Sequence, residues 1–166
     1  MLRKRKSKIL IILFIVMIIL TGCDRETEAT RFKREYESFN DKLSVVNIPE
    51  DNPFVYKTQE EILSLIDTEK AFVVFYGNPQ NEDCRAIIDT IINEAKTSGL
   101  KTIYYVETKD TDEYQVQIQR IEQLPSLIAV VKRQFYAISN TSEYVNVVIG
   151  PVAKELNTCD INNGGC

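Results

Sequence analysis

The chain has 166 residues, 27% of them charged, and a formal net charge of −4. It contains no histidine, which excludes a Ser-His-Asp triad, a Cys-His pair and a histidine-ligated metal site. Residues 1–22 hold five of the 20 basic residues and none of the 24 acidic ones, so the remainder has 15 against 24, a net charge of −9. Such an acidic surface argues against nucleic-acid binding and against an electrostatic contact with a membrane.

The N-terminus has the pattern of a secretory signal peptide. Five basic residues within residues 1–8 precede the apolar stretch Ile9 to Leu20, which is about 18 Å long as a helix and shorter than the ~30 Å hydrocarbon core. Leu20-Thr21-Gly22-Cys23 resembles the lipobox of bacterial lipoproteins. The resemblance implies that Cys23 is acylated, becomes the first mature residue and anchors the protein on the extracytoplasmic face of the cell membrane. An ordinary signal sequence with an incidental cysteine is the alternative.

The rest of the chain is long enough for one domain with a sizeable core. Four segments are predicted: a signal peptide at 1–22, a lipidated N-terminus with a polar spacer and helix at 23–50, a domain at 51–158, and a cysteine-bounded tail at 159–166. Within the second segment, apolar residues at helical spacing predict a helix that lies against the domain, with a disordered tether as the alternative. These residues are Phe32, Tyr36, Phe39 and Leu43.

A strand at 54–56 is followed by a capping-box pattern, Thr58 with Glu61, which predicts a helix over 59–67. The apolar run 71–76 predicts a central strand buried on both faces. Asn81 then caps a helix that ends at Gly99, and a strand follows over 100–106. This strand-helix-strand unit predicts parallel strands.

The remaining elements complete the order β, α, β, α, β, α, β, β, α. A polar helical segment is predicted at 112–122 and strands at 126–131 and 144–149. Pro151 is expected to open a last helix that runs to about Asn157.

Two local motifs in this order resemble the thioredoxin family. The first is the central strand followed by Gly77-Asn78-Pro79-Gln80-Asn81-Glu82-Asp83-Cys84-Arg85, which is similar to Gly-x-Pro-x-Cys-x-x-Cys-Arg. The second cysteine of that motif is present as Cys84, and Asn81 replaces the first. The other motif is Leu124-Pro125 before an apolar strand, similar to the loop that holds a cis-proline in thioredoxins. A trans-proline that merely opens a strand is the alternative.

The resemblance implies an α/β thioredoxin-like fold, a central mixed sheet flanked by helices, with a binding groove at Asn81, Leu124 and Pro125. It implies little activity, because Asn81 cannot attack a disulfide and Phe75 stands where many thioredoxins have a buried carboxylate. The charges of Glu82 and Asp83 also disfavour a thiolate at Cys84, although both acids suit a first helical turn, and Arg85 offsets part of their effect.

Three functions remain open at this stage: an accessory or binding protein, similar to bacteriocin-transport accessory proteins; a monothiol oxidoreductase acting through Cys84; and a structural envelope protein. Cys159 and Cys166 are expected to pair with each other, although a disulfide from either to Cys84 is an alternative. The expected partners are the membrane, through Cys23, and a protein or peptide of the cell envelope. No cofactor, metal or nucleic acid is expected.

Overall fold

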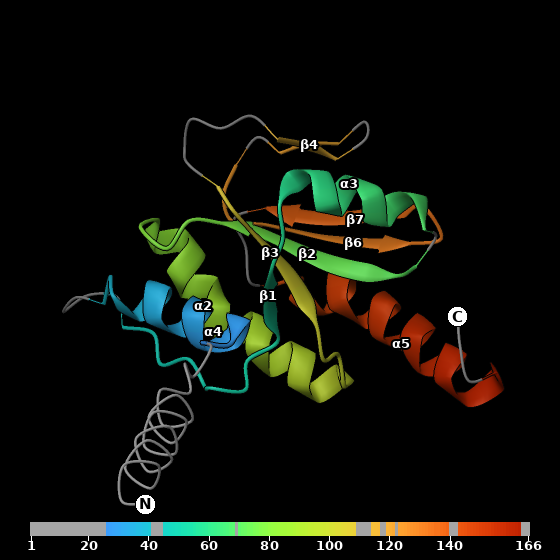
Figure 1. Cartoon of the computed structure of the whole chain (residues 1–166), viewed down its shortest axis with the longest axis horizontal. Helices are drawn as coiled ribbons and strands as arrows, with labels where there is room; N and C mark the ends of the chain where they lie inside the picture. Colours follow the sequence, from blue (N-terminus) through green and yellow to red (C-terminus); the bar gives the residue numbers. More distant parts are fainter. Residues whose placement is uncertain are drawn as a thin grey trace, which may run out of the picture.

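A computed structural model of the chain describes residues 26–40, 45–68, 70–108, 114–116, 119–121, 123–139 and 143–163. They form an α/β fold around a five-stranded mixed sheet with the strand order β1-β3-β2-β6-β7, and a separate hairpin pairs β4 with β5 (Figure 1). The helices are α2 (Glu28–Glu37), α3 (Gln59–Asp67), α4 (Glu82–Ser98) and α5 (Val145–Asn163). The strands are β1 (Phe54–Tyr56), β2 (Phe72–Gly77), β3 (Ile103–Glu107), β4 (Tyr114–Val116), β5 (Gln119–Ile121), β6 (Ser126–Val131) and β7 (Gln134–Ser139).

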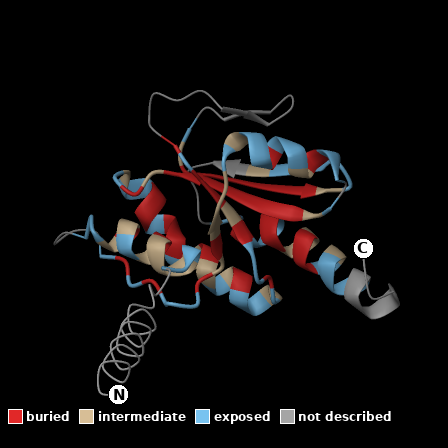
Figure 2. Cartoon of the chain, viewed as in Figure 1, coloured by how far each residue is buried: buried red, intermediate tan, exposed pale blue. Residues whose placement is uncertain are grey.

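The central strand β2 is buried along its whole length, as its apolar run predicts (Figure 2). Side chains alternate between the two faces of a strand. Val73 and Phe75 therefore join the core formed with α2, α4 and α5, while Val74 and Tyr76 join a second core under α3. Helices thus cover both faces of the sheet, with α3 on one side and α4 and α5 on the other (Figure 1).

The pairing confirms the predicted strand-helix-strand unit, because β3 runs parallel to β2. β1 is also parallel to β3, whereas β6 pairs antiparallel with β2 and with β7. A mixed sheet of this order, flanked by helices, is compatible with the thioredoxin fold.

The capping signals in the sequence mark the helix boundaries correctly. Thr58 and Glu61 form the predicted capping box at the start of α3, each side chain accepting the other's backbone N–H. Asn81 is the N-cap of α4, and Gly99 ends that helix in the left-handed conformation with φ = 76°. At that φ, glycine escapes the steric cost that a side chain would add.

Helix α2 belongs to the fold rather than to a tether. Phe32 and Tyr36, two of the predicted stripe residues, are fully buried, whereas Phe39 is 39% exposed and Leu43 lies outside the described residues. The ring of Phe32 stacks on that of Phe54 in β1 at 3.9 Å between centroids. The predicted helix is therefore confirmed, and its aromatic side chains complete the core beside the edge strand.

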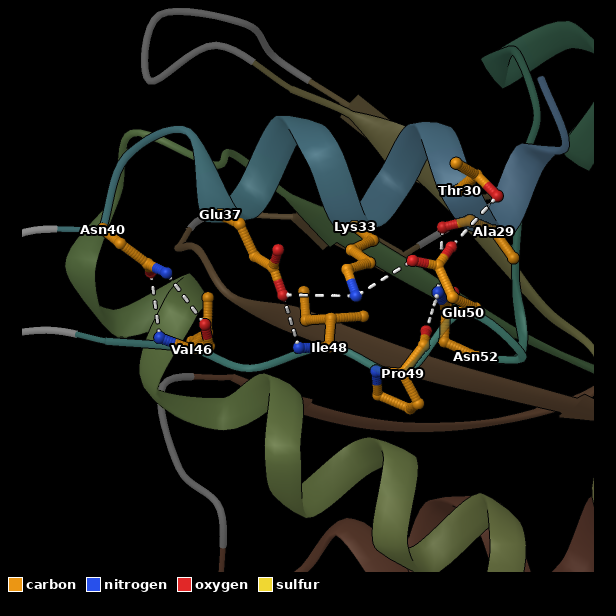
Figure 3. A network of polar contacts seen from close by, with 10 residues as sticks. All are labelled: Ala29, Thr30, Lys33, Glu37, Asn40, Val46, Ile48, Pro49, Glu50 and Asn52. Carbon is orange, nitrogen blue, oxygen red and sulfur yellow. Dashed lines mark hydrogen bonds and ion pairs between the residues drawn. The ribbon is translucent and has the colours of Figure 1, made fainter.

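Polar contacts fasten α2 to the segment 45–52 that follows it (Figure 3). Asn52, itself buried, donates to the backbone oxygen of Ala29, and the Ile48 N–H donates to Glu37. Lys33 bridges to Glu50 at 3.1 Å. These contacts join the beginning and the end of α2 to the chain just before β1.

Three predictions for the second half of the chain were wrong. Residues 114–116 and 119–121 form the strands β4 and β5 rather than part of a polar helix. The predicted strand 144–149 lies mostly in helix α5, and Pro151, expected to open a helix, stands inside it. α5 also extends beyond Asn157, and β7 was not predicted. The apolar residues of α5 recur at spacings of three and four and bury one face of the helix. The segment is rich in β-branched residues, which favour a strand locally, and this hides the helical period in the sequence. The buried residues are Val145, Val148, Ile149, Val152 and Ala153.

Candidate functional site

The candidate site lies where β2 ends and α4 begins. The loop 78–81 connects these elements, and Cys84 is the third residue of α4, as predicted. The Asn81 side chain accepts the Cys84 N–H at 3.0 Å. Asn81 therefore has a structural role as the helix cap, because its amide oxygen satisfies one of the N–H groups that a helix leaves unpaired at its start.

The sulfur of Cys84 is enclosed by protein. The residue has 0% exposure and belongs to the core that contains Phe75 and Ile88. The backbone N–H of Asn78 donates to Sγ at 3.4 Å. A disulfide exchange step requires direct contact between a thiolate sulfur and a disulfide sulfur, and solvent has no access to Cys84 in this arrangement.

Two buried tyrosine hydroxyls lie on the core side of this loop. Tyr36 of α2 donates to Tyr105 of β3 at 3.5 Å, and Tyr105 donates to the carbonyl oxygen of Gly77 at 3.1 Å. Thr108 donates to the same oxygen through its backbone N–H at 2.8 Å and its hydroxyl at 3.1 Å. The end of β2 is thus fixed by three donors that converge on one carbonyl group.

Burial keeps these phenols protonated. Desolvation raises the pKa of Tyr36 well above its usual value, and Tyr105 and Cys84 nearby raise it further. Burial likewise raises the pKa of Tyr105. Phe75, which the resemblance places where many thioredoxins have a carboxylate, is fully buried and brings no ionisable group to this part of the core. Apart from the helical spacing of Phe32 and Tyr36, no sequence pattern predicts this arrangement of hydroxyls.

Arg85 stabilises the loop 78–81 by hydrogen bonds to its backbone. Its side chain is 6% exposed, and Nη1 donates to the backbone oxygens of Pro79 and Gln80 at 2.9 and 3.0 Å. The sequence suggested that this guanidinium offsets the charges of Glu82 and Asp83, which are both exposed. Its contacts with the two carbonyl groups also give it a part in shaping the loop.

The proline loop lies at the same edge of the sheet. The Leu124-Pro125 bond is cis, as predicted. Tyr76 is the partner of Ser126 in the antiparallel pair of β2 and β6. By continuation of this register, Pro125 lies alongside Gly77, next to the loop 78–81. Pro125 is buried and Leu124 is half-buried. Because Asn81 ends the loop 78–81 and Pro125 lies alongside Gly77, Asn81 and the two residues of the proline loop lie at one edge of the sheet.

The predictions for the other three cysteines lie outside the described residues. Cys23 and Cys166 are not described, and Cys159 is described only as a backbone position in α5. Across the described ranges, no three Cys, Asp or Glu side chains are grouped as a metal site would require. Among these same residues, no helix is both long and apolar enough to cross a bilayer. No family model matches the chain, and no curated protein is significantly similar to it.

Proposed function

We propose that this chain is a membrane-anchored, extracytoplasmic thioredoxin-like protein that binds a protein or peptide partner of the cell envelope and has no dithiol oxidoreductase activity. The observation that carries the proposal is the state of the two motif positions. Asn81 caps a helix and supplies no thiol, while Cys84 has 0% exposure. A dithiol mechanism needs an exposed attacking thiolate and a second thiol to release the product.

The arrangement of the site supports a binding role. The loop 78–81 is fixed by Arg85, and the end of β2 is fixed by the hydroxyls that converge on Gly77. Such a rigid loop next to Leu124 and Pro125 suits recognition of an extended segment, since a preformed surface loses little conformational entropy on binding. The role resembles that of accessory proteins near bacteriocin exporters and envelope assembly machines.

Insulin reduction by residues 24–166 tests the redox part of the proposal. We expect the wild type to match the uncatalysed rate. Asn81→Cys should produce measurable turnover, which Cys84→Ser should abolish in the same background. Asn81→Ser is the matched control, because serine is a comparable N-cap but brings no thiol. Activity of the wild type that Cys84→Ser removes would instead establish the monothiol mechanism, with Cys159 or Cys166 as the resolving partner.

Site-specific photo-crosslinking in cells tests the binding part. A photoreactive side chain at Leu124 or Gln80 should give a discrete protein adduct. The same group at Thr97, which is exposed near the far end of α4, should give none. Equal labelling patterns from the three positions would contradict a binding surface at this edge.

A further inference from the structure

Strand β7 is the last strand of the sheet, and among the described residues no strand pairs with its outer side. It contains no charged residue, no proline and no glycine. Native proteins protect edge strands with charges, prolines or short lengths, because unpaired backbone groups can pair with another chain. The opposite edge strand, β1, is protected in this way: it is three residues long, follows Pro53 and packs against α2. β7 is thus the edge that is open to pairing.

The pairing of β7 with β6 determines which backbone groups are available at this edge. The residues that flank a two-residue hairpin turn form a hydrogen-bonded pair, and Val131 and Gln134 have these positions. Antiparallel pairs then alternate between hydrogen-bonded and non-hydrogen-bonded ones. The backbone N–H and C=O groups of Phe135 and Ala137 therefore point away from β6. A second antiparallel strand can bond to them without breaking a bond of the sheet.

Exposed apolar side chains lie along this edge, on the face of the sheet that α5 covers. Tyr136 is the register partner of Ala129, which belongs to the core that contains α5, and Tyr136 is 37% exposed. Tyr144, directly before α5, and Val147 are 51% and 52% exposed. Aromatic and aliphatic side chains this exposed add apolar surface to the free backbone groups of β7.

The exposed apolar side of α5 is the side next to β7. Tyr144, Val147, Pro151 and Glu155 follow one another at spacings of three and four, so they share one side of the helix. Glu155 bridges to Lys132, in the turn between β6 and β7, at 3.1 Å. Tyr144 and Val147 are therefore on the β7 side of α5 rather than on the α4 side.

A second copy of the chain is complementary to this edge. Two identical antiparallel strands in one sheet are related by a twofold axis normal to the sheet, so the apolar side chains of both copies lie on the same face. Because β7 has no charged residue, its pairing with itself brings no like charges together. α2 also packs on the face of α5, so with Cys23 acylated as proposed, both anchors leave from one face of the joined sheet.

We propose that two copies of the chain associate by antiparallel pairing of their β7 strands. The two five-stranded sheets then form one continuous sheet, and Tyr136, Tyr144 and Val147 become covered at the junction. One strand pair and a few apolar side chains make a small interface, so we expect a Kd on the order of 10–100 µM. Anchoring of both copies in one membrane raises their effective concentration. Only this last point rests on the proposed function, because the pairing itself needs neither the anchor nor the groove.

Sedimentation equilibrium of the full chain in a density-matched neutral detergent tests the proposal. We expect a monomer–dimer equilibrium, and Tyr136→Lys should raise its Kd at least tenfold by placing charges along the edge. Ala137→Pro should have the same effect, because it removes an outward N–H and leaves the bonds to β6 intact. Leu63→Lys is the matched control: Leu63 is 41% exposed on α3, on the other face of the sheet, and its replacement should leave the Kd unchanged.

Amide hydrogen exchange identifies the surface that is covered. Exchange at Phe135 and Ala137 should slow as the protein concentration rises through the Kd. A wild type that stays monomeric, equal effects of Tyr136→Lys and Leu63→Lys, or a dimer without protection of these two amides would each overturn the proposal. Cys23→Ala should dimerise in detergent as the wild type does, so failure of the anchor and failure of the interface give different results.

Discussion

Replacing Gly77 by alanine would place a methyl group where buried side-chain atoms already lie. A Cβ at this position would be 2.7 Å from the hydroxyl oxygen of Tyr36 and 2.7 and 2.8 Å from two ring carbons of Phe75. Both side chains have 0% exposure, so neither ring can move into solvent. The backbone at the end of β2 must shift instead.

The expected cost follows from two effects. Overpacking a buried site costs about 1–3 kcal/mol. A shift of Gly77 also weakens the hydrogen bonds that its carbonyl accepts from Tyr105 and Thr108, each worth about 1 kcal/mol. We therefore expect Gly77→Ala to lower the free energy of unfolding by about 3 kcal/mol, which corresponds to a decrease in Tm of roughly 10 °C for a chain of this size.

Gly150→Ala is the matched control. An added Cβ at Gly150 has no neighbour within 4 Å, and the residue lies inside α5. Alanine should therefore stabilise the protein by about 0.5–1 kcal/mol, because glycine is a poor helix former. Urea unfolding followed by far-UV circular dichroism measures both variants, since the chain has no tryptophan for fluorescence.

A double-mutant cycle locates the clash. Tyr36→Phe removes one of the three close atoms and only a weak hydrogen bond of 3.5 Å. It should recover about 1 kcal/mol in the Gly77→Ala background and cost less than that alone. If Gly77→Ala stays within 0.5 kcal/mol of the wild type, the packing of α2 against the end of β2 is not as tight as described.

Three further predictions concern alkaline stability, the anchor and a strained turn. Folding raises the pKa of Tyr36 and Tyr105 above their ordinary value near 10. The stability that they contribute is therefore present below pH 10 and decreases above it by about 1.4 kcal/mol per pH unit for each tyrosine. Urea unfolding midpoints between pH 8 and 12 measure this decrease. Tyr105→Phe should reduce that slope; an unchanged slope would contradict the assignment. Cys23→Ala should abolish labelling by a fatty-acid analogue, and equal labelling of both proteins would refute the lipoprotein proposal. Lys132 and Arg133 have positive φ of 51° and 61°, a conformation that Asn and Gly adopt at less cost. Replacing the pair by Asn-Gly should therefore raise the free energy of unfolding by about 1 kcal/mol, measured by thermal denaturation. A loss of stability would show that the turn is not strained.

Local signals predicted much of the fold because they act through neighbouring residues. The capping box at Thr58, the cap at Asn81 and the left-handed Gly99 each satisfy or end a backbone pattern within a few residues. The segment that begins α5 was misread, because its β-branched residues favour a strand locally. Its burial against the sheet stabilises the helix instead, and this tertiary contribution outweighs the local preference.

The site was predictable only in part. The resemblance at Cys84 and Pro125 indicated the edge of the sheet, and the cis bond agrees with it. Tyr36 and Gly77 are 41 residues apart in sequence, and the hydroxyl of Tyr36 lies near Gly77 only because α2 packs beside β1. The hydroxyl of Tyr105 bonds to the Gly77 carbonyl only because β3 pairs with β2. Neither contact leaves a pattern in the sequence, because each depends on tertiary geometry.

Helix α2 begins close to Cys23 in sequence, and this limits the distance between the site and a membrane to which Cys23 is anchored. Thr27, the N-cap of α2, is four residues beyond Cys23, and four extended residues span at most about 14 Å. The ten-residue helix adds about 15 Å between this point and Tyr36 near the site. With Cys23 acylated as proposed, the binding edge therefore lies within about 30 Å of the lipid headgroups. A peptide partner of the kind proposed must therefore be presented within that layer next to the membrane surface.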